Sequence, residues 1–484
     1  MGILRHLAAS AALVSLAAPA AAQPGGPAPV DARMDAVLAA LQPPAQVAGR
    51  SHAGQPLAEM MRHYRVPAVS IAYVEDGRIV WVRAFGAADV AARRAATPTT
   101  MFQAASISKP VAATAALALV ERGRLQLDAP VNPMLASWDV PDNELTRDAP
   151  VTLRHLLTHT AGLTVHGFPG YDRTAALPTL LQILDGLPPS NTPAVRVDQR
   201  PGSAWRYSGG GYTVLQQLMS DVAGRPFPEL MNRLVLRPAR MRNSRFGPLD
   251  PARARTAASG YRSDGAAIAA GHMVHPELAA AGLWSTPSDL ARWALAVTAA
   301  YHGRSSRPIS PASARAMLTS GQGNWGLGLP VDREGEWLRF SHGGSNQGFR
   351  ANLVFFPRRR EGIVVMTNSD NGHLLFTAII QAVGRSRGWP DSAPHLVNAV
   401  AVPASALADA VGRYASPDVQ AEIVLAGDRL TMSLQGGPAS ELVPQAVDRY
   451  ILLDLGLEVT ADRDPASGRV VSISGAGITL ARVP

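Results

Sequence analysis

The sequence contains no cysteine and only one lysine. The lack of cysteine excludes disulfides, thiolate metal sites and a cysteine nucleophile. Lys109 is the single lysine among 45 basic side chains, and all the others are arginine. Charged residues (17%) and aromatic residues (6%) are also sparse, whereas hydrophobic residues make up 47% of the chain. This composition is typical of a globular protein with a substantial core.

No stretch is long and apolar enough to span a bilayer, which requires about 20 residues. The apolar run at residues 7–16 is too short for this, but it follows Arg5 and precedes small residues that end at Ala22. This order predicts a secretory signal peptide over residues 1–22, cleaved after Ala22. We therefore expect a periplasmic or secreted protein without stable membrane insertion.

The basic charge is spread along the chain, although the formal net charge is +8. The one run of three arginines, residues 358–360, lies between two apolar runs, which favours a solvated hairpin turn. This distribution argues against a nucleic-acid partner. We expect a small-molecule or short-peptide substrate instead, and the sequence does not determine the oligomeric state.

A chain of 484 residues predicts two or three folding units. Residues 67–86 predict a β-hairpin and residues 351–368 a second strand pair, while the pattern between them is mostly helical. Strands at both ends with helices between them predict an α/β fold, in which an antiparallel sheet is flanked by helices and carries a mostly helical insert. We assign this domain to residues 31–390.

The last part of the chain differs in composition. Residues 391–408 are rich in proline, alanine and serine, and we interpret them as a linker. Residues 409–484 contain short β-type runs separated by glycine turns, which predict a small all-β domain. This domain has no obvious nucleophile or metal cluster, so we expect an accessory role in packing or positioning.

The lone lysine follows a serine at helical spacing. Ser106 and Lys109 share one face if a helix begins here, with Cβ atoms about 5–6 Å apart. A serine hydroxyl is a weak nucleophile until a neighbouring base removes its proton. Arginine stays protonated in proteins, whereas a partly buried lysine can become neutral. We therefore interpret Ser106 as a nucleophile and Lys109 as its proton partner.

Four short motifs together resemble the serine β-lactamase-like superfamily. They are SISK (residues 106–109), LLTHTAGL (156–163), YSGGGY (207–212) and HGGSNQG (342–348). This superfamily contains class C β-lactamases, D-alanyl-D-alanine carboxypeptidases, D-amino acid peptidases and family VIII esterases. The resemblance covers about residues 31–390 and implies a β-lactamase/transpeptidase-like fold and hydrolysis through an acyl-enzyme. We expect no cofactor and no metal. The tail resembles the small β-barrel-like domains attached to some members.

The resemblance also implies individual roles. Tyr207 stands at the position of the tyrosine that passes a proton to the leaving group and helps activate water. His342 falls on the edge strand beside the nucleophile. The backbone N–H groups of Ser106 and Ser345 would form the oxyanion hole, which commonly contributes the largest share of the rate enhancement.

Five further positions are expected to contact substrate. Glycines beside a strand let a ligand approach the backbone closely, and the candidates of this kind are Gly343 and Gly344. Gly209 follows the tyrosine, and His166 and Tyr171 lie in the glycine-rich loop HGFPGY.

Two departures from the family pattern bear on specificity. Gly209 stands where the family often has an asparagine that binds an amide of the substrate. His342 stands where penicillin-recognising members usually carry lysine, and an ordinary histidine is cationic only part of the time. Both changes weaken recognition of a β-lactam or peptide carboxylate and leave ester hydrolysis possible, so we expect an esterase-type serine hydrolase. The alternatives are a D-alanyl-D-alanine carboxypeptidase or D-aminopeptidase, a β-lactamase, and a non-catalytic acyl-binding sensor.

Other patterns carry less. His155 and His159 stand four apart, but no glutamate follows the first, so we interpret them as a packing pair and not as zinc ligands. The stretch GQGNWG, residues 321–326, matches a dinucleotide motif without the strand and helix that such a motif requires, and we interpret it as a turn. Glu277 is interpreted as structural, with a role in deacylation as the alternative.

Overall fold

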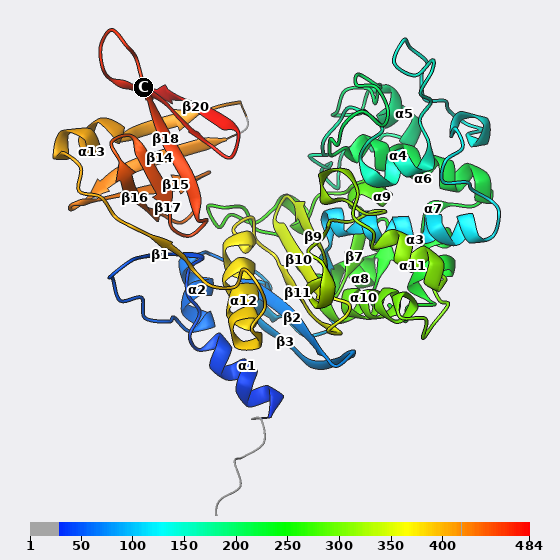
Figure 1. The fold of residues 1–484 in the computed structure, drawn as a ribbon, viewed down its shortest axis with the longest axis horizontal. Helices are drawn as coiled ribbons and strands as arrows, with labels where there is room; N and C mark the ends of the chain where they lie inside the picture. Colours follow the sequence, from blue (N-terminus) through cyan, green and yellow to red (C-terminus); the bar gives the residue numbers. More distant parts are fainter. Residues whose placement is uncertain (1–28, 418) are drawn as a thin grey trace, which may run out of the picture.

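The structure is a computed structural model that describes residues 29–417 and 419–484; the predicted signal peptide lies outside the described residues. Figure 1 shows a large part that mixes helices and strands and a smaller C-terminal part built from strands. The predicted fold class, an antiparallel sheet with flanking helices, a helical insert and an all-β C-terminal domain, is confirmed. Within the described ranges, no helix is long and apolar enough to cross a bilayer.

A seven-stranded antiparallel sheet forms the centre of the large domain, in the order β4-β3-β2-β11-β10-β9-β8. Its strands are β2 (Ala68–Glu75), β3 (Arg78–Asp89), β4 (Arg94–Ala95), β8 (Val331–Asp332), β9 (Arg339–Asn346), β10 (Phe349–Phe356) and β11 (Glu361–Thr367). Distant parts of the chain meet where Ile71 of β2 lies opposite Val365 of β11. Residues 358–360, the predicted arginine turn, connect β10 to β11.

Helices cover both faces of this sheet. One face is covered by three helices that share a core with β2 and β11. They are α1 (Val30–Leu38), α2 (Leu57–His63) and α12 (Gly372–Arg387). The other face carries α3 (Ser108–Glu121) and α10 (Pro287–Tyr301). The helical insert adds α4 (Leu153–Thr158), α5 (Leu180–Asp185), α6 (Gly209–Ala223), α7 (Phe227–Met231), α8 (Pro251–Thr256), α9 (Leu278–Ala281) and α11 (Pro311–Met317). A small sheet in the order β5-β7-β6 joins β5 (Phe102–Gln103), β7 (Leu283–Ser285) and β6 (Arg245–Phe246).

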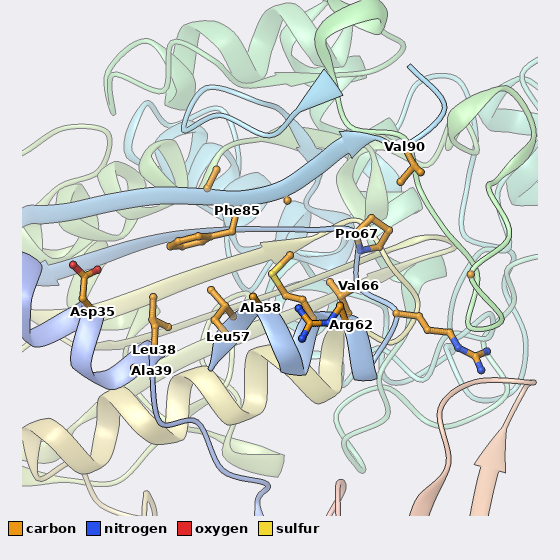
Figure 2. A pocket seen from close by; sticks show the side chains of 15 residues that line it. Asp35, Leu38, Ala39, Leu57, Ala58, Arg62, Val66, Pro67, Phe85 and Val90 are labelled. Carbon is orange, nitrogen blue, oxygen red and sulfur yellow. The ribbon is translucent and has the colours of Figure 1, made fainter. Parts of the chain in front are cut away.

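An apolar groove with a volume of about 1010 Å³ opens where α1 and α2 approach β3. Figure 2 shows Leu38, Leu57, Val66 and Phe85 along it. These side chains belong to the core between the sheet and the helices α1, α2 and α12. The helix α3 packs in the core on the opposite face of the sheet. The groove is therefore separated from α3 by the sheet itself.

The C-terminal part is a closed antiparallel barrel of eight strands. They are β13 (Gly412–Ala415), β14 (Gln420–Ala426), β15 (Arg429–Leu434), β16 (Ser440–Ala446), β17 (Arg449–Leu452), β18 (Leu457–Arg463), β19 (Val470–Gly475) and β20 (Ile478–Val483). The barrel closes because β13 pairs with both β14 and β20. Alternate residues such as Tyr414, Leu430 and Leu452 point inward and fill it.

The segment between the two parts has structure of its own. Residues 391–408, predicted as a linker, contain β12 (His395–Val397), which pairs in parallel with β1 (Ala45–Val47), and the start of α13 (Ala404–Ala410). The barrel also contacts the large domain directly, because Arg50 pairs with Glu441 at 2.7 Å and the Tyr64 hydroxyl donates to Asp454 at 3.1 Å.

Candidate active site

Ser106 lies in a single turn of 3-10 helix, η1 (Ala105–Ile107), directly before α3. It is half-buried, and every other residue from 101 to 119 is buried. The helix α3 is mostly hydrophobic on every side and lies within the core. A helix without a polar face is normally buried in this way. The turn thus brings one hydroxyl of this stretch towards the surface.

The backbone before the serine is held in an unusual conformation. Ala105 has φ of 48°, in the left-handed region that residues other than glycine rarely adopt. Ser108 supports this turn: its hydroxyl donates to the carbonyl oxygen of Ala105 at 2.5 Å and accepts from the N–H of Leu283 at 2.9 Å. Strain of this kind is concentrated at functional sites, where the surrounding structure maintains it.

Lys109 lies beside Ser106. Its Nζ is 3.2 Å from Ser106 Oγ and donates to the carbonyl oxygen of Ala280 at 2.9 Å. Lys109 as a whole is 2% exposed, and within residues 29–417 and 419–484 it forms no ion pair with a carboxylate. The rings of Tyr207 and Tyr212 lie with centroids 4.9 and 5.7 Å from Nζ. The structure therefore places this amine against the hydroxyl in a buried and largely aromatic environment.

Tyr207 precedes α6 and packs against His159 with ring centroids 4.3 Å apart. The N–H of Ser208 donates to His159 Nδ1 at 3.1 Å, so the imidazole carries its proton on Nε2. Trp325, from the GQGNWG turn, contacts the same histidine with centroids 4.9 Å apart. Burial first, and then the positive charge of Lys109, hold the pKa of His159 well below its usual value.

His159 is a residue that sequence reasoning placed in a packing pair without connecting it to the tyrosine. The available signal was its place in the LLTHTAGL motif. In the structure it ends α4 with φ of 58°, which turns the ring towards Tyr207, whereas His155 forms a capping interaction with Thr152 at the start of the same helix. His159 is thus a neutral positioning residue for the Tyr207 ring.

His342 lies on β9 and is 4% exposed. Its Nδ1–H donates to the carbonyl oxygen of Gly343 at 2.6 Å, and its ring contacts Trp325 with centroids 5.6 Å apart. Burial, followed by the charge of Lys109, lowers the pKa of His342 to about 3. The imidazole is therefore neutral near neutral pH, so this strand position supplies no cation.

The edge of β9 faces η1, the turn that carries Ser106. β8 pairs with β9 only at Arg339 and Phe340, which leaves the later part of this edge open. At Gly344 a methyl group would lie 2.2 Å from the carbonyl oxygen of Ala104, so only glycine allows β9 to approach η1 this closely. Residue pairs that exchange hydrogen bonds alternate along an antiparallel ladder with pairs that do not. In the pairing of β9 with β10, this alternation directs the N–H of Ser345 away from β10 and towards the open edge.

The other expected substrate contacts are placed differently from one another. His166 is exposed, and its ring centroid lies 5.0 Å from that of Tyr207. At Gly209 a side chain would meet the Phe168 ring at 2.9 Å, so the 166–168 loop occupies the space that an asparagine would need. Tyr171 is 5% exposed, and its hydroxyl accepts from the N–H of Asn191 at 3.1 Å, which makes it part of the loop packing.

Glu277 is fully buried directly before α9, the helix whose Ala280 carbonyl accepts from Lys109. Neither carboxylate oxygen has a hydrogen-bond partner among the residues that the structure describes. Burial raises the pKa of Glu277 to about 7.

An antiparallel sheet with a helical insert and a Ser-x-x-Lys pair at the start of a buried helix defines the class of serine hydrolases with the β-lactamase/transpeptidase-like fold. The chain belongs to the Beta-lactamase family, which matches residues 55–383. The resemblance inferred from the four sequence motifs is thereby confirmed.

The relatives include an esterase and a penicillin-binding protein. Esterase EstB of Burkholderia gladioli is 33% identical over 208 residues, which cover 40% of this chain and 51%, about half, of the esterase. Penicillin-binding protein 4* of Bacillus subtilis (strain 168) is 24% identical over 431 residues, which cover 83% of this chain and 92% of that protein.

Solved structures share the fold. The octameric penicillin-binding protein homologue from Pyrococcus abyssi superposes with a TM-score of 0.60 at 23% identity, covering 88% of this chain and 98% of that one. The D-amino acid amidase from Ochrobactrum anthropi SV3 complexed with L-phenylalanine gives 0.57 at 19% identity, covering 74% and 100%. At these sequence identities, the similarity to the solved structures shows a shared fold.

Proposed function

We propose that the protein is an exported serine hydrolase that cleaves a small ester through an acyl-enzyme on Ser106. The observation that carries the proposal is the buried Lys109 amine, 3.2 Å from Ser106 Oγ and without a carboxylate partner in the described parts of the chain. An amine held in this way can accept the hydroxyl proton, because no neighbouring anion stabilises its charged form.

In the first half of the reaction, Lys109 takes the proton of Ser106 and Oγ attacks the carbonyl carbon. The N–H groups of Ser106 and Ser345 stabilise the oxyanion, the C–O bond breaks, and the alcohol leaves with a proton supplied by the pair Tyr207 and Lys109. In the second half, the same pair removes a proton from water, which attacks the acyl carbon. The bond between that carbon and Ser106 Oγ then breaks, Oγ regains the proton from the pair, and the acid is released. The Lys109 amine lies 4.9 Å from the centroid of the Tyr207 ring, so either group is a candidate for each proton transfer.

The preference for esters follows from what surrounds the serine. A neutral His342 offers no positive charge to a substrate carboxylate. The 166–168 loop fills the space beside Gly209, so no side-chain amide is available there to bind a peptide or β-lactam amide. Ester cleavage needs neither contact, because the nucleophile and the oxyanion hole act on the carbonyl itself.

Fluorophosphonate labelling tests the nucleophile. The natural protein should be labelled covalently at one serine, and Ser106→Ala should abolish both the label and the hydrolysis of p-nitrophenyl esters. Ser203→Ala is the matched control, because Ser203 is exposed and its hydroxyl donates to the Arg200 carbonyl. Labelling that persists unchanged in Ser106→Ala contradicts the proposal.

A substrate comparison tests the specificity. We expect p-nitrophenyl esters to be hydrolysed with a higher kcat/KM than a chromogenic cephalosporin or a D-amino acid amide. Faster turnover of either competitor would replace the esterase by a β-lactamase or a D-peptidase. Acylation of Ser106 without release of product would replace it by the acyl-binding sensor.

A further inference from the structure

A second pocket of the large domain is strongly cationic. It has a volume of about 1120 Å³ and lies between the loop before β5, the π-helical turn η3 (Asn232–Leu236) with the loop that follows it, and α8. Six arginines line it, namely Arg94, Arg237, Arg240, Arg242, Arg245 and Arg253. Its lining contains a single acidic residue, Glu229, which already pairs with Arg225 at 2.5 Å.

This balance differs from that of the whole chain, which has 45 basic and 37 acidic side chains. Basic side chains are therefore concentrated in the pocket, whereas in the rest of the chain acidic side chains nearly balance them. A concave wall of one sign focuses the electrostatic potential and attracts small ions of the opposite sign.

Three of the six arginines are held in place by the protein. Arg94 donates to the carbonyl oxygens of Thr256 at 3.0 Å and Ala257 at 2.5 Å. Arg245 and Arg253 share the single carboxylate of Asp250. Two cations on one anion leave a net positive charge, and the buried Nε of Arg245 has no partner in the described ranges. These guanidinium groups are thus fixed without being neutralised.

The other three arginines are available to a ligand. Arg237, Arg240 and Arg242 are exposed, and their side chains form no hydrogen bond or ion pair with any described residue. The guanidinium group presents parallel N–H donors that match the oxygens of a phosphate or carboxylate. Neutral donors also line the pocket, among them the side chains of Asn232 and Asn243.

We propose that this pocket binds a small, multiply charged oxyanion of the polyphosphate or phosphorylated-metabolite type. Phosphate groups carry up to two charges and several acceptor oxygens each, which suits a set of six arginines better than a single carboxylate would. Ligand pockets usually measure about 300–1,000 Å³, so this one has room for more than one phosphate group.

The pocket is separate from the proposed active site but connected to it. None of its lining residues is part of the Ser106 site. β6, which carries Arg245, pairs with β7, and β7 pairs with β5, the strand that leads into η1. Because the pocket shares no residue with the Ser106 site, ligand binding there can be measured separately from ester hydrolysis.

Isothermal titration calorimetry with inorganic pyrophosphate and with inorganic tripolyphosphate, at low ionic strength, tests the proposal. The natural protein should bind, with an affinity that falls as salt is added. The combined variant Arg237→Gln, Arg240→Gln, Arg242→Gln should bind at least about tenfold more weakly, because each charge-assisted hydrogen bond contributes more than a neutral one. The ester hydrolysis of this variant should be unchanged.

The matched control is Arg78→Gln, Arg147→Gln, Arg304→Gln. These three arginines are also exposed and without side-chain partners among the described residues, so the net charge changes equally. The control should bind tripolyphosphate like the natural protein. An equal loss in both variants, or no binding by the natural protein, overturns the proposal.

Two further measurements complete the test. Tripolyphosphate should raise the Tm of the single variant Arg242→Gln by less than it raises the Tm of the natural protein, which reports binding even if the triple variant folds poorly. Vesicles containing phosphatidylglycerol distinguish a membrane headgroup from a soluble ligand. Binding to vesicles without binding to either soluble anion also overturns the proposal.

Discussion

At the scale of single residues, an amine and a guanidinium differ at position 109 in their ability to release a proton. Both are cations on long flexible side chains. Only the amine can act as a base, because a guanidinium stays protonated in proteins.

We therefore predict that Lys109→Arg folds but loses a factor of about 10²–10⁴ in kcat, the usual contribution of general acid–base catalysis. The measurement is the steady-state hydrolysis of a p-nitrophenyl ester, with the Tm as a check on folding. Arg147→Lys makes the reverse change at an exposed position and should have no effect. Retention of most of the activity by Lys109→Arg would exclude Lys109 as the base.

Glu277 gives a pH prediction for stability. Its pKa is about 7 in the folded protein and 4.5 in the unfolded chain, so its contribution is fully present below pH 4.5 and is lost as the pH rises through 7. The loss amounts to about 3 kcal/mol, at 1.36 kcal/mol per unit. Glu277→Gln does not titrate, so its stability relative to the natural protein should increase from pH 4.5 to 7.

Urea denaturation at several pH values measures this difference. The quantity to compare is how the free energy of unfolding changes with pH. Its absolute value is less informative, because the glutamine amide of Glu277→Gln also places unpaired polar groups in this buried position. A constant difference between the two proteins across this range would show that Glu277 is not protonated more readily in the folded state.

At the scale of elements, the site depends on three short segments that meet: η1 with the serine, the edge of β9, and α9. α9 links β9 to α3, the helix that continues η1. Ala280 O accepts from Lys109 of α3, and the carbonyl oxygen of Ala281 accepts from Asn346 Nδ2 of β9 at 3.2 Å. The lysine and the end of β9 are therefore positioned by one turn of helix.

The approach of β9 to η1 predicts different outcomes for two adjacent glycines. At Gly344 a methyl group would lie 2.2 Å from Ala104 O, whereas at Gly343 the nearest atom is 4.0 Å away. Gly344→Ala should cost about 1–3 kcal/mol of stability by overpacking. It should also lower kcat by about 10²–10³, the effect of losing one oxyanion donor, because β9 moves away from the serine.

Thermal unfolding and ester hydrolysis of both variants provide the measurement. Gly343→Ala should keep the Tm of the natural protein, whatever its effect on substrate contact. Equal Tm values for the two alanine variants would mean that β9 does not press against η1.

At the scale of the whole molecule, the barrel is joined to the large domain by ion pairs and a partly buried hydrogen bond, and the segment that leads into it pairs with β1 through β12. Tyr64 is 1% exposed, and its hydroxyl donates to Asp454 of the barrel. A hydrogen bond to a charged group typically contributes about 1.5–3 kcal/mol, so the two parts should unfold with mutual dependence.

A double-mutant cycle of Tyr64→Phe and Asp454→Ala should therefore show a coupling energy of about 1–3 kcal/mol in chemical denaturation. Arg225→Ala and Glu229→Ala form the comparison pair, since that exposed ion pair should couple by less than about 1 kcal/mol. Additive effects at Tyr64 and Asp454 would mean that this contact does not connect the two parts energetically.

Several features could be predicted from the sequence because they depend on neighbours in the chain. The proximity of Ser106 and Lys109 follows from a spacing of three at the start of a helix. The hairpin of β2 and β3 follows from two β-type runs around Asp76 and Gly77. The order of strands and helices was sufficient for the fold class.

Other features could not be predicted, because they depend on residues that are distant in the sequence. The LLTHTAGL motif marks His159 but does not indicate that its ring packs on Tyr207, which lies in another segment. Nothing in the local sequence indicates that Glu277 is buried without a hydrogen-bond partner among the described residues, or that six arginines from three segments line one pocket. Tyr171 shows the same limit: its glycine-rich loop suggested contact with substrate, whereas the fold buries the ring.

The sequence by itself determined which chemistry is available: a lone lysine beside a serine, glycines along a strand, and a histidine where a permanent cation is common in relatives. Only the tertiary structure decided the charge of that histidine, because its pKa depends on burial and on the nearby Lys109. It also decided that the space beside Gly209 is filled, since Phe168 reaches it through a separate loop. Local spacing places neighbouring residues along the chain, whereas desolvation and packing depend on every segment that folds around them.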